Sequence, residues 1–247
     1  MRLKPLLLYP VGTSESCRYA SSFLEKDGFS LTDHPCPEIT HLLLDVPSKE
    51  SEGLEGLLRM LPDSVTVIGG KLTQDFLKHY RTVDLLKEPY YLAANAAITA
   101  ECALRFAAPY LKTTFAGSHA LILGWGRIGK CLAQLLSACG CSVTVAARKE
   151  SDRAMLKALG FGAVDFPEIT EVLTHCRILF NTVPDLPPDN HFPDNWTKGI
   201  AIDLASHPGM QCSSVIPARG LPGKYAPESS GKLIAESILR LIKEEKQ

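Results

Sequence analysis

The residues best suited to chemistry form the segment "GWGRIG" at 124–129. It follows the apolar run "HALIL" and opens a stretch of helical periodicity, which is the setting of a dinucleotide-binding loop. There the three glycines permit a tight turn, close approach to a pyrophosphate, and close packing of helix on strand. The helix start also offers N–H donors to phosphates. We therefore predict cofactor contacts from a set of six residues, with a ligand-free turn as the alternative: Gly124, Trp125, Gly126, Arg127, Ile128 and Gly129.

The end of the next apolar run, "SVTVAA", bears on which nucleotide is bound. It closes at Ala147, where NAD-binding proteins usually carry an acidic residue for the adenosine ribose. Arg148 and Lys149 follow instead, and a guanidinium presents paired donors that suit a phosphate. Contacts from Ala147, Arg148 and Lys149 would favour NADP, with NAD as the second choice. The alternative is that Arg148 and Lys149 are solvent-exposed cations at the start of a helix and contact no ligand.

Further polar residues follow the later predicted strands, in "LFNTVP" (179–184), "DLASHPG" (203–209) and "GLPGKYAPESSG" (220–231). Ligands of doubly wound sheets bind at the carboxyl ends of strands. Either Asn181 and Thr182 face the nicotinamide, or they cap the following turn. His207, beside Ser206, is either a proton-transfer group or a loop residue. The residues from these segments predicted to contact the cofactor are Asn181, Thr182, Val183, Pro184 and Asp203.

The elements that must position these residues alternate between apolar runs and helical patterns. In the first part of the chain strands are expected at 6–9, 41–46 and 65–70, with helices near 14–27, 51–61 and 73–79. In the second part strands are expected at 119–124, 142–147, 177–184 and 199–206, with helices at 127–139, 151–159 and 168–174. This rhythm predicts an α/β protein of two Rossmann-like lobes, each a parallel sheet with helices on both faces.

A long Ala-rich helix at 94–111 is expected to join the lobes, with Thr99 and Glu101 near its start. The predicted domains are an N-terminal α/β lobe at 1–93 and an NAD(P)-binding Rossmann domain at 94–226 that includes this helix. A closing helix within 227–247 is expected to return across a cleft and complete the first lobe. Residues 220–223 are expected to form a loop whose amides face a ligand.

Composition excludes several classes of protein. The formal net charge of the 247 residues is −1, and no basic patch with interleaved aromatics indicates nucleic-acid binding. No apolar run approaches the roughly 18 to 20 residues that span a bilayer. The eight cysteines contain no C-x-x-C pair and no nearby histidine at ligand spacing, so we predict no metal site. Buried free thiols in a cytoplasmic protein are the expected account.

Taken in order, the motifs resemble those of the family of the A subunit of dipicolinate synthase. The resemblance rests on 95–104, 117–129, 143–148, 179–184, 203–209 and 220–238, and covers about residues 90 to 245. It implies an NADP-dependent oxidoreductase that forms dipicolinate from a dihydro or hydroxytetrahydro precursor, is associated with sporulation, and acts beside a second, flavoprotein-like subunit. The chain departs from the family pattern at Met210, where the family has Gly, and at His207, where it often has Arg.

The resemblance also implies a dicarboxylate substrate, whose candidate binding residues are Arg127, His207, Lys224, Gly223 and Asn95. The candidate catalytic residues are Glu101 as base, or else as a stabiliser of its helix end, with Thr99, Ser206 and His207. One alternative is a catalytically silent NADP-binding regulatory subunit. The weaker alternative is a D-2-hydroxyacid dehydrogenase, because the Arg and the Glu–His pair of those enzymes are missing. Whether copies associate as a homo-oligomer is left open.

Overall fold

The computed structural model describes residues 6–48, 53–184, 186, 196–210 and 214–244. The chain divides into two compact units, one formed by residues 1–95 with 222–247 and the other by residues 96–221. The expected divisions were at residues 93 and 227. Each unit is described below by itself.

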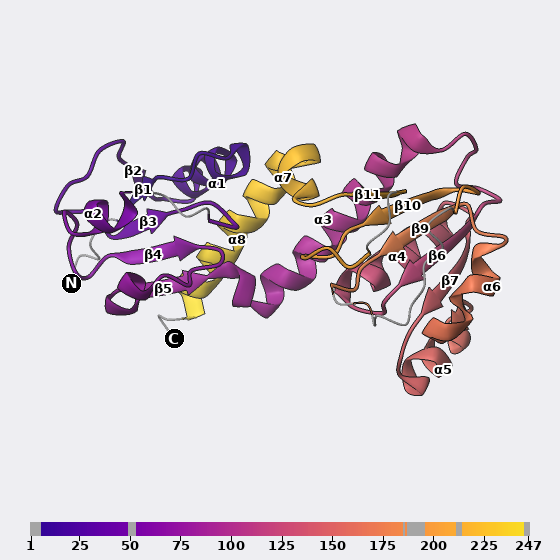
Figure 1. The fold of residues 1–247 in the computed structure, drawn as a ribbon. Coiled ribbons are helices and arrows are strands. Elements are labelled where there is room, and N and C mark those ends of the chain that lie inside the picture. Colours follow the sequence, from indigo (N-terminus) through magenta and orange to yellow (C-terminus); the bar gives the residue numbers. More distant parts are fainter. Residues whose placement is uncertain (1–5, 49–52, 185, 187–195, 211–213, 245–247) are drawn as a thin grey trace. The chain divides into compact units, whose positions relative to one another are not determined.

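The first unit contains a five-stranded parallel sheet in the order β2-β1-β3-β4-β5 (Figure 1). Its strands are β1 (Leu7–Pro10), β2 (Ser30–Leu31), β3 (His41–Leu43), β4 (Thr66–Gly69) and β5 (Arg81–Asp84). Strands β2 and β5 were not expected, because one is two residues long and the other is polar and partly exposed. The helices are α1 (Glu15–Lys26) and α2 (Leu54–Leu58), and a 3-10 helix, η1 (Asp75–His79), replaces the α-helix expected at 73–79.

The closing helix, α8 (Pro227–Glu244), belongs to this first unit and packs along α1. Its contact face is close-fitting at Gly231, where a Cβ would lie 2.5 Å from Tyr19 Cβ and 2.6 Å from the Ser16 carbonyl oxygen. Ile238, Leu241 and Ile242 of α8 share a cavity wall with β3, β4 and β5. Leu54 and Leu58 of α2 pack with Leu42 and Val67 in a separate cluster. The expected end of α8 at Lys246 lies outside the described residues.

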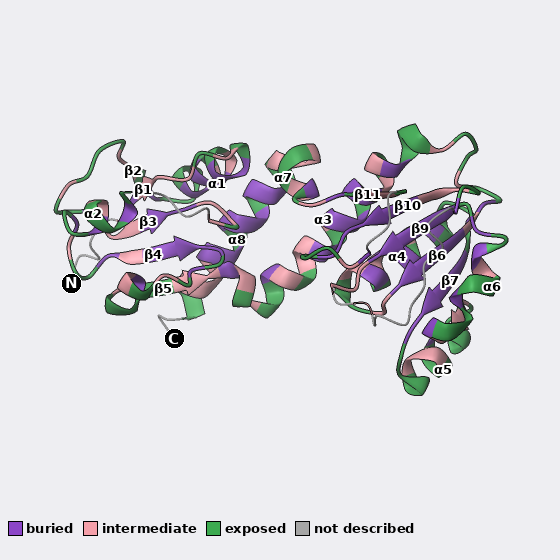
Figure 2. Cartoon of the chain, in the orientation of Figure 1, coloured by how far each residue is buried: buried purple, intermediate pink, exposed green. Residues whose placement is uncertain are grey.

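The second unit has six parallel strands in the order β11-β10-β9-β6-β7-β8. Counted from β6, this is the 3-2-1-4-5-6 order of the Rossmann fold. The strands are β6 (His119–Leu123), β7 (Ser142–Ala146), β8 (Gly162–Val164), β9 (Ile178–Asn181), β10 (Ile200–Asp203) and β11 (Val215–Pro217). The inner strands are buried along most of their length (Figure 2), which matches their continuous apolar runs. The predicted fold class is confirmed.

The helices of this unit that follow β6 in sequence include α4 (Arg127–Ala138), α5 (Glu150–Ala158) and α6 (Ile169–Leu173), with a 3-10 turn, η4 (Phe166–Glu168). One core cluster packs Leu121, Leu123 and Leu179 of the sheet against Ile169 and Leu173 of α6. Strand β11, a short and half-exposed segment, was not expected.

Two elements differ from expectation where the units meet in sequence. Helix α3 runs from Pro89 to Ala107, followed by the 3-10 turn η3 (Ala108–Tyr110), so it begins before residue 94. Proline suits the first helical position because its missing N–H is not needed there. Thr99 and Glu101 therefore lie in the middle of α3 and not near its start. Residues 221–225 form a short helix, α7 (Leu221–Tyr225), and not the predicted loop.

The longer helices of the described ranges include none with the length and apolar character needed to cross a bilayer.

Candidate nucleotide-binding site

The glycine-rich turn joins β6 to α4 at the point where the strand order of the second unit reverses, between β6 and β9. Gly124 has φ +99°, and a Cβ there would lie 2.7 Å from both Thr182 Oγ1 and Val183 Cγ2. The Thr182 hydroxyl donates to the Leu123 carbonyl oxygen at 2.8 Å. A residue with a side chain at 124 would be strained and would collide with the end of β9. The turn therefore depends on glycine for two independent reasons.

The other two glycines have opposite surroundings. A Cβ at Gly129 would overlap the carbonyl oxygen of Gly124, so glycine allows α4 to lie directly against the turn. A Cβ at Gly126 would meet nothing within 4 Å. Gly126 is the N-cap of α4 and makes no side-chain cap, so the first N–H groups of α4 are not capped by it. Open space before uncapped helical N–H groups is what a pyrophosphate requires.

A pocket of about 250 Å³ lies over this turn. Nine residues that the sequence predicted line it, together with Asp152 and Phe166, which it did not predict. The nine come from three strand ends: Gly124, Trp125, Gly126, Ala147, Arg148, Lys149, Thr182, Val183 and Pro184. The remaining predicted cofactor residues do not line it: Arg127 is exposed at the start of α4, Ile128 and Gly129 lie in its first turn, and Asn181 and Asp203 are buried.

The end of β7 presents a cation to this pocket. Ala147 is buried, whereas Arg148 and Lys149 are exposed. Arg153 stabilises the turn after β7, because its Nη1 donates to the carbonyl oxygens of Ala147 at 2.7 Å and of Arg148 at 2.8 Å. Arg153 also pairs with Asp165 at 3.1 Å. The Arg148 guanidinium makes no ion pair within the described part of the chain, so it is available to an anionic ligand.

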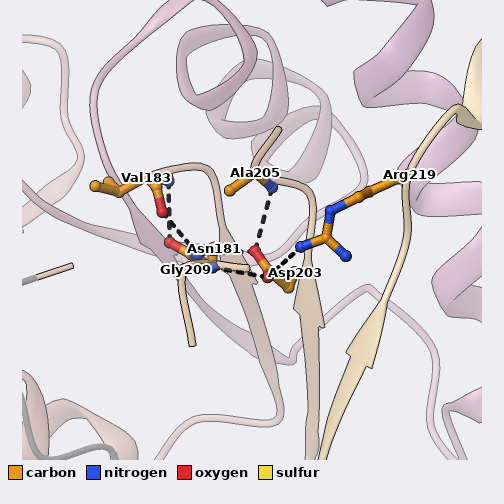
Figure 3. A network of polar contacts seen from close by, with 6 residues as sticks. All are labelled: Asn181, Val183, Asp203, Ala205, Gly209 and Arg219. Atoms are coloured by element: carbon orange, nitrogen blue, oxygen red, sulfur yellow. Dashed lines mark hydrogen bonds and ion pairs between the residues drawn. The ribbon is translucent and has the colours of Figure 1, made fainter. Parts of the chain in front are cut away.

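Asp203, at the end of β10, is the centre of a buried hydrogen-bond network (Figure 3). Its Oδ1 accepts from Asn181 Nδ2 at 2.8 Å and from Ala205 N at 3.2 Å. Its Oδ2 accepts from Gly209 N at 3.1 Å and pairs with Arg219 Nη2 at 2.9 Å. With four donors already on the carboxylate, Asp203 is placed to hold backbone and not to contact a nucleotide.

Asn181, at the end of β9, caps the turn that follows it, which is the alternative its sequence position left open. Its Oδ1 accepts from Val183 N, and its Nδ2 donates to Val183 O, both at 3.0 Å. Asn181 is fully buried, and the turn it holds, 182–184, lines the pocket. Asn181 thus acts on the pocket through Val183.

Ser206 and His207 are exposed in the loop after β10 and make no hydrogen bond to another described residue. Met210, the departure from the family pattern, is buried and joins the core cluster of the second unit. The loop itself is held at both ends, through Ala205 and Gly209, by Asp203.

The other candidate residues lie on two helices. Thr99 is buried on α3 and Glu101 is exposed on it, both in the second unit, whereas Asn95 of the same helix falls in the first. Gly223 and Lys224 are exposed on α7 and also fall in the first unit. Their roles stay predictions.

No cysteine of the described ranges lines the pocket. Burial raises the pKa of Cys176 to about 12 and that of Cys141 to about 11, and both therefore stay protonated at neutral pH. Of the cysteines within the described ranges, Cys139 is exposed, which corrects the expectation that the thiols are buried. Those ranges hold no group of three or more His, Cys, Asp or Glu side chains placed to bind a metal ion.

The strand order and the pocket over the glycine-rich turn are those of a dinucleotide-binding domain, and the comparisons with known proteins support an NAD(P)-binding protein of the dehydrogenase type. The family model described as "D-isomer specific 2-hydroxyacid dehydrogenase, NAD binding domain" matches residues 94–195. This covers the glycine-rich turn, the end of β7 and the 182–184 turn, which are the parts that line the pocket.

Among the proteins that the chain resembles is the A subunit of dipicolinate synthase. The chain is 30% identical over 159 residues to this protein from Bacillus subtilis (strain 168), a match that covers 61% of the chain and 54%, about half, of that relative. Crystal structures of the same protein from Bacillus halodurans and from Bacillus subtilis superpose with a TM-score of 0.81 at 21% identity. They cover 98% of the chain, which in turn covers 98% and 97% of theirs. The resemblance expected from the motifs is confirmed.

Proposed function

We propose that this chain is an NADP-dependent oxidoreductase that oxidises a dihydro- or hydroxytetrahydrodipicolinate to dipicolinate. The observation that carries the proposal is the pocket over Gly126, whose lining includes Ala147, at the position where an acidic residue would favour NAD, and the neighbouring cation Arg148. The similarity to dipicolinate synthase supports the choice of substrate. A flavoprotein-like partner subunit, a cytoplasmic location and a role in sporulation belong to the same proposal.

The chain's own residues have three tasks in such a reaction. The backbone at Gly126 and the start of α4 would hold the pyrophosphate, and Arg148 would hold the 2′-phosphate. The hydride acceptor would be supplied by the nicotinamide cofactor held there. The ring that becomes aromatic also loses a proton, for which Glu101 is the proposed acceptor. The hydroxytetrahydro form must in addition lose one molecule of water. Arg127 and His207 of the second unit are the proposed cations for the substrate carboxylates.

The test is turnover by the purified full chain, with dihydrodipicolinate or its hydroxylated tetrahydro form and either NADP⁺ or NAD⁺. We expect dipicolinate and reduced nicotinamide in equal amounts, faster with NADP⁺. Glu101→Gln should lower kcat by roughly 10²- to 10⁴-fold and leave nucleotide affinity unchanged, because Glu101 is exposed and does not line the pocket.

Three other outcomes would revise the proposal. Nucleotide binding without turnover, both by the chain alone and after addition of the flavoprotein-like partner, would favour the silent regulatory role. Reduction of a 2-oxo acid in place of dipicolinate formation would favour a D-2-hydroxyacid dehydrogenase, in line with the family model over 94–195. Absence of binding to either nucleotide would overturn the assignment of the cofactor.

A further inference from the structure

The Asp203 network joins the carboxyl ends of three neighbouring strands. Its donors come from β9 (Asn181), from the loop after β10 (Ala205 and Gly209) and from the turn that follows β11 (Arg219). The Asp203 side chain is only 3% exposed, and that of Arg219 is 35% exposed. A buried carboxylate needs its hydrogen-bond partners, and Arg219 supplies the charged one.

The network ends at the wall of the pocket. Asn181 holds Val183 through both its N–H and its carbonyl oxygen. Gly209 packs closely against the same turn, since a Cβ at this position would overlap the Val183 carbonyl oxygen and Asn181 Nδ2. Thr182, Val183 and Pro184 line the pocket, whereas Asn181, Asp203, Gly209 and Arg219 do not. Figure 3 shows the continuous path from Arg219 through Asp203 and Asn181 to Val183.

The position of this wall in the sheet tells which half of the ligand it serves. In the Rossmann strand order a dinucleotide lies across the switch point, with its adenosine on the side of the first two strands. Here those strands are β6 and β7, where Ala147 and Arg148 lie. Strand β9 lies on the other side of β6, so the 182–184 turn faces the nicotinamide half.

We propose that Arg219 is a positioning residue which, through Asp203 and Asn181, holds the 182–184 turn in the shape that binds the nicotinamide half of the cofactor. The inference rests on the proposed binding of a nicotinamide dinucleotide. Arg219 itself does not contact the cofactor. Its removal leaves Asp203 without its charged partner, which loosens the turn and leaves the adenosine side unchanged.

The experiment compares the intact cofactor with its adenosine fragment by calorimetric titration of the full chain. The variant is Arg219→Met, and the probes are NADP(H) and 2′,5′-ADP, or NAD(H) and ADP if the wild type prefers NAD. We expect the dinucleotide to bind roughly tenfold more weakly, as for loss of one charge-assisted hydrogen bond. The fragment should bind within about twofold of the wild type, because it contacts the β6–β7 side alone.

Two further variants separate positioning from general stability. Arg219→Lys keeps a cation near Asp203 and should restore most of the dinucleotide affinity. Arg177→Met is the matched control. Arg177 also lies in the second unit, just before β9 begins, but it donates to the Lys198 carbonyl oxygen and not to Asp203. Its replacement should leave the affinities for the dinucleotide and for the fragment unchanged. If Arg219→Met does not fold, Arg219→Gln, which keeps one donor, takes its place in the same comparison.

The results that would contradict the role of Arg219 differ from the result that would contradict cofactor binding by the wild type. Equal weakening of dinucleotide and fragment would mean that Arg219 supports the fold alone. Unchanged binding of both would mean that the turn keeps its shape without Arg219. In either case the wild type binds the dinucleotide, whereas a wild type that binds neither nucleotide would fail the cofactor assignment itself.

Discussion

At the scale of single residues, the pocket depends on side-chain chemistry at a few strand ends. Ala147 is buried where an acidic residue would repel a 2′-phosphate, and Arg148 is exposed beside it. Arg153 fixes the backbone of both residues, so the Arg148 side chain is presented by a held turn. Its forked donors suit a phosphate better than a ribose hydroxyl.

Arg148→Ala should therefore change nucleotide preference more than affinity for the shared parts of the ligand. We expect the ratio of NADP to NAD affinity to fall by roughly tenfold, the value of a charge-assisted hydrogen bond to phosphate. Titration followed by fluorescence of Trp125, which lines the pocket, measures both affinities. Arg177→Ala is the matched control, because Arg177 is exposed, does not line the pocket and has no proposed contact with the ligand. A ratio that is the same in wild type and Arg148→Ala would contradict this role.

At the level of secondary-structure elements, two glycines of the glycine-rich turn have different roles, one in helix packing and one in leaving space for a ligand. Gly129 serves the packing of α4 on the turn, and Gly126 leaves space in front of the α4 N-terminus. The pattern alone does not tell these roles apart. The surroundings of each Cβ position do, because one position is filled by protein and the other is open.

The pair Gly129→Ala and Gly126→Ala should consequently separate folding from binding. Gly129→Ala forces a methyl group onto the Gly124 carbonyl and should destabilise the second unit by ~1–3 kcal/mol. Gly126→Ala should leave the unfolding midpoint near the wild-type value but weaken dinucleotide binding, since its methyl group occupies the approach of the pyrophosphate. Thermal unfolding and calorimetric titration of both variants are the measurements. Equal stability of the two would refute the assignment.

At the scale of the whole molecule, the first unit is discontinuous in sequence, because residues 222–247 join residues 1–95. Helix α8 packs on α1 through Gly231, where the backbone of Ser16 and the side chain of Tyr19 leave no room for a Cβ. A change near the C-terminus is thus expected to act on the N-terminal unit and not on the nucleotide-binding unit that precedes it in sequence.

Gly231→Ala tests this division. The added methyl group should cost ~1–3 kcal/mol of stability in the first unit through overpacking, which exceeds the gain of about 1 kcal/mol from replacing glycine in a helix. Amide hydrogen exchange should accelerate in α1 and α8 but not in β6 or α4, and dinucleotide affinity should be unchanged. Ser229→Ala, an exposed position on the same helix, is the control. Faster exchange in β6 and α4 would show that the units do not unfold separately.

Sequence patterns are sufficient to predict the fold class, the inner strands of both sheets and the glycine-rich turn. These follow from local properties, namely continuous apolar runs, helical periodicity and glycines at fixed spacing. Short elements with weak patterns, such as β2, β5, β11 and α7, were missed because tertiary contacts select them. The start of α3 was misplaced because its first turn, at Pro89, carries little of the Ala-rich pattern.

Which polar residues line the pocket and which support its wall became known from the folded chain and not from the sequence. Asn181 and Asp203 have sequence positions that suit ligand contact, yet both are buried with their polar atoms bonded to protein. Arg219, Asp152 and Phe166 had no feature in the sequence to single them out. Strand pairing brings these residues together from distant parts of the chain. Their roles depend on contacts between segments far apart in sequence, which no local pattern specifies.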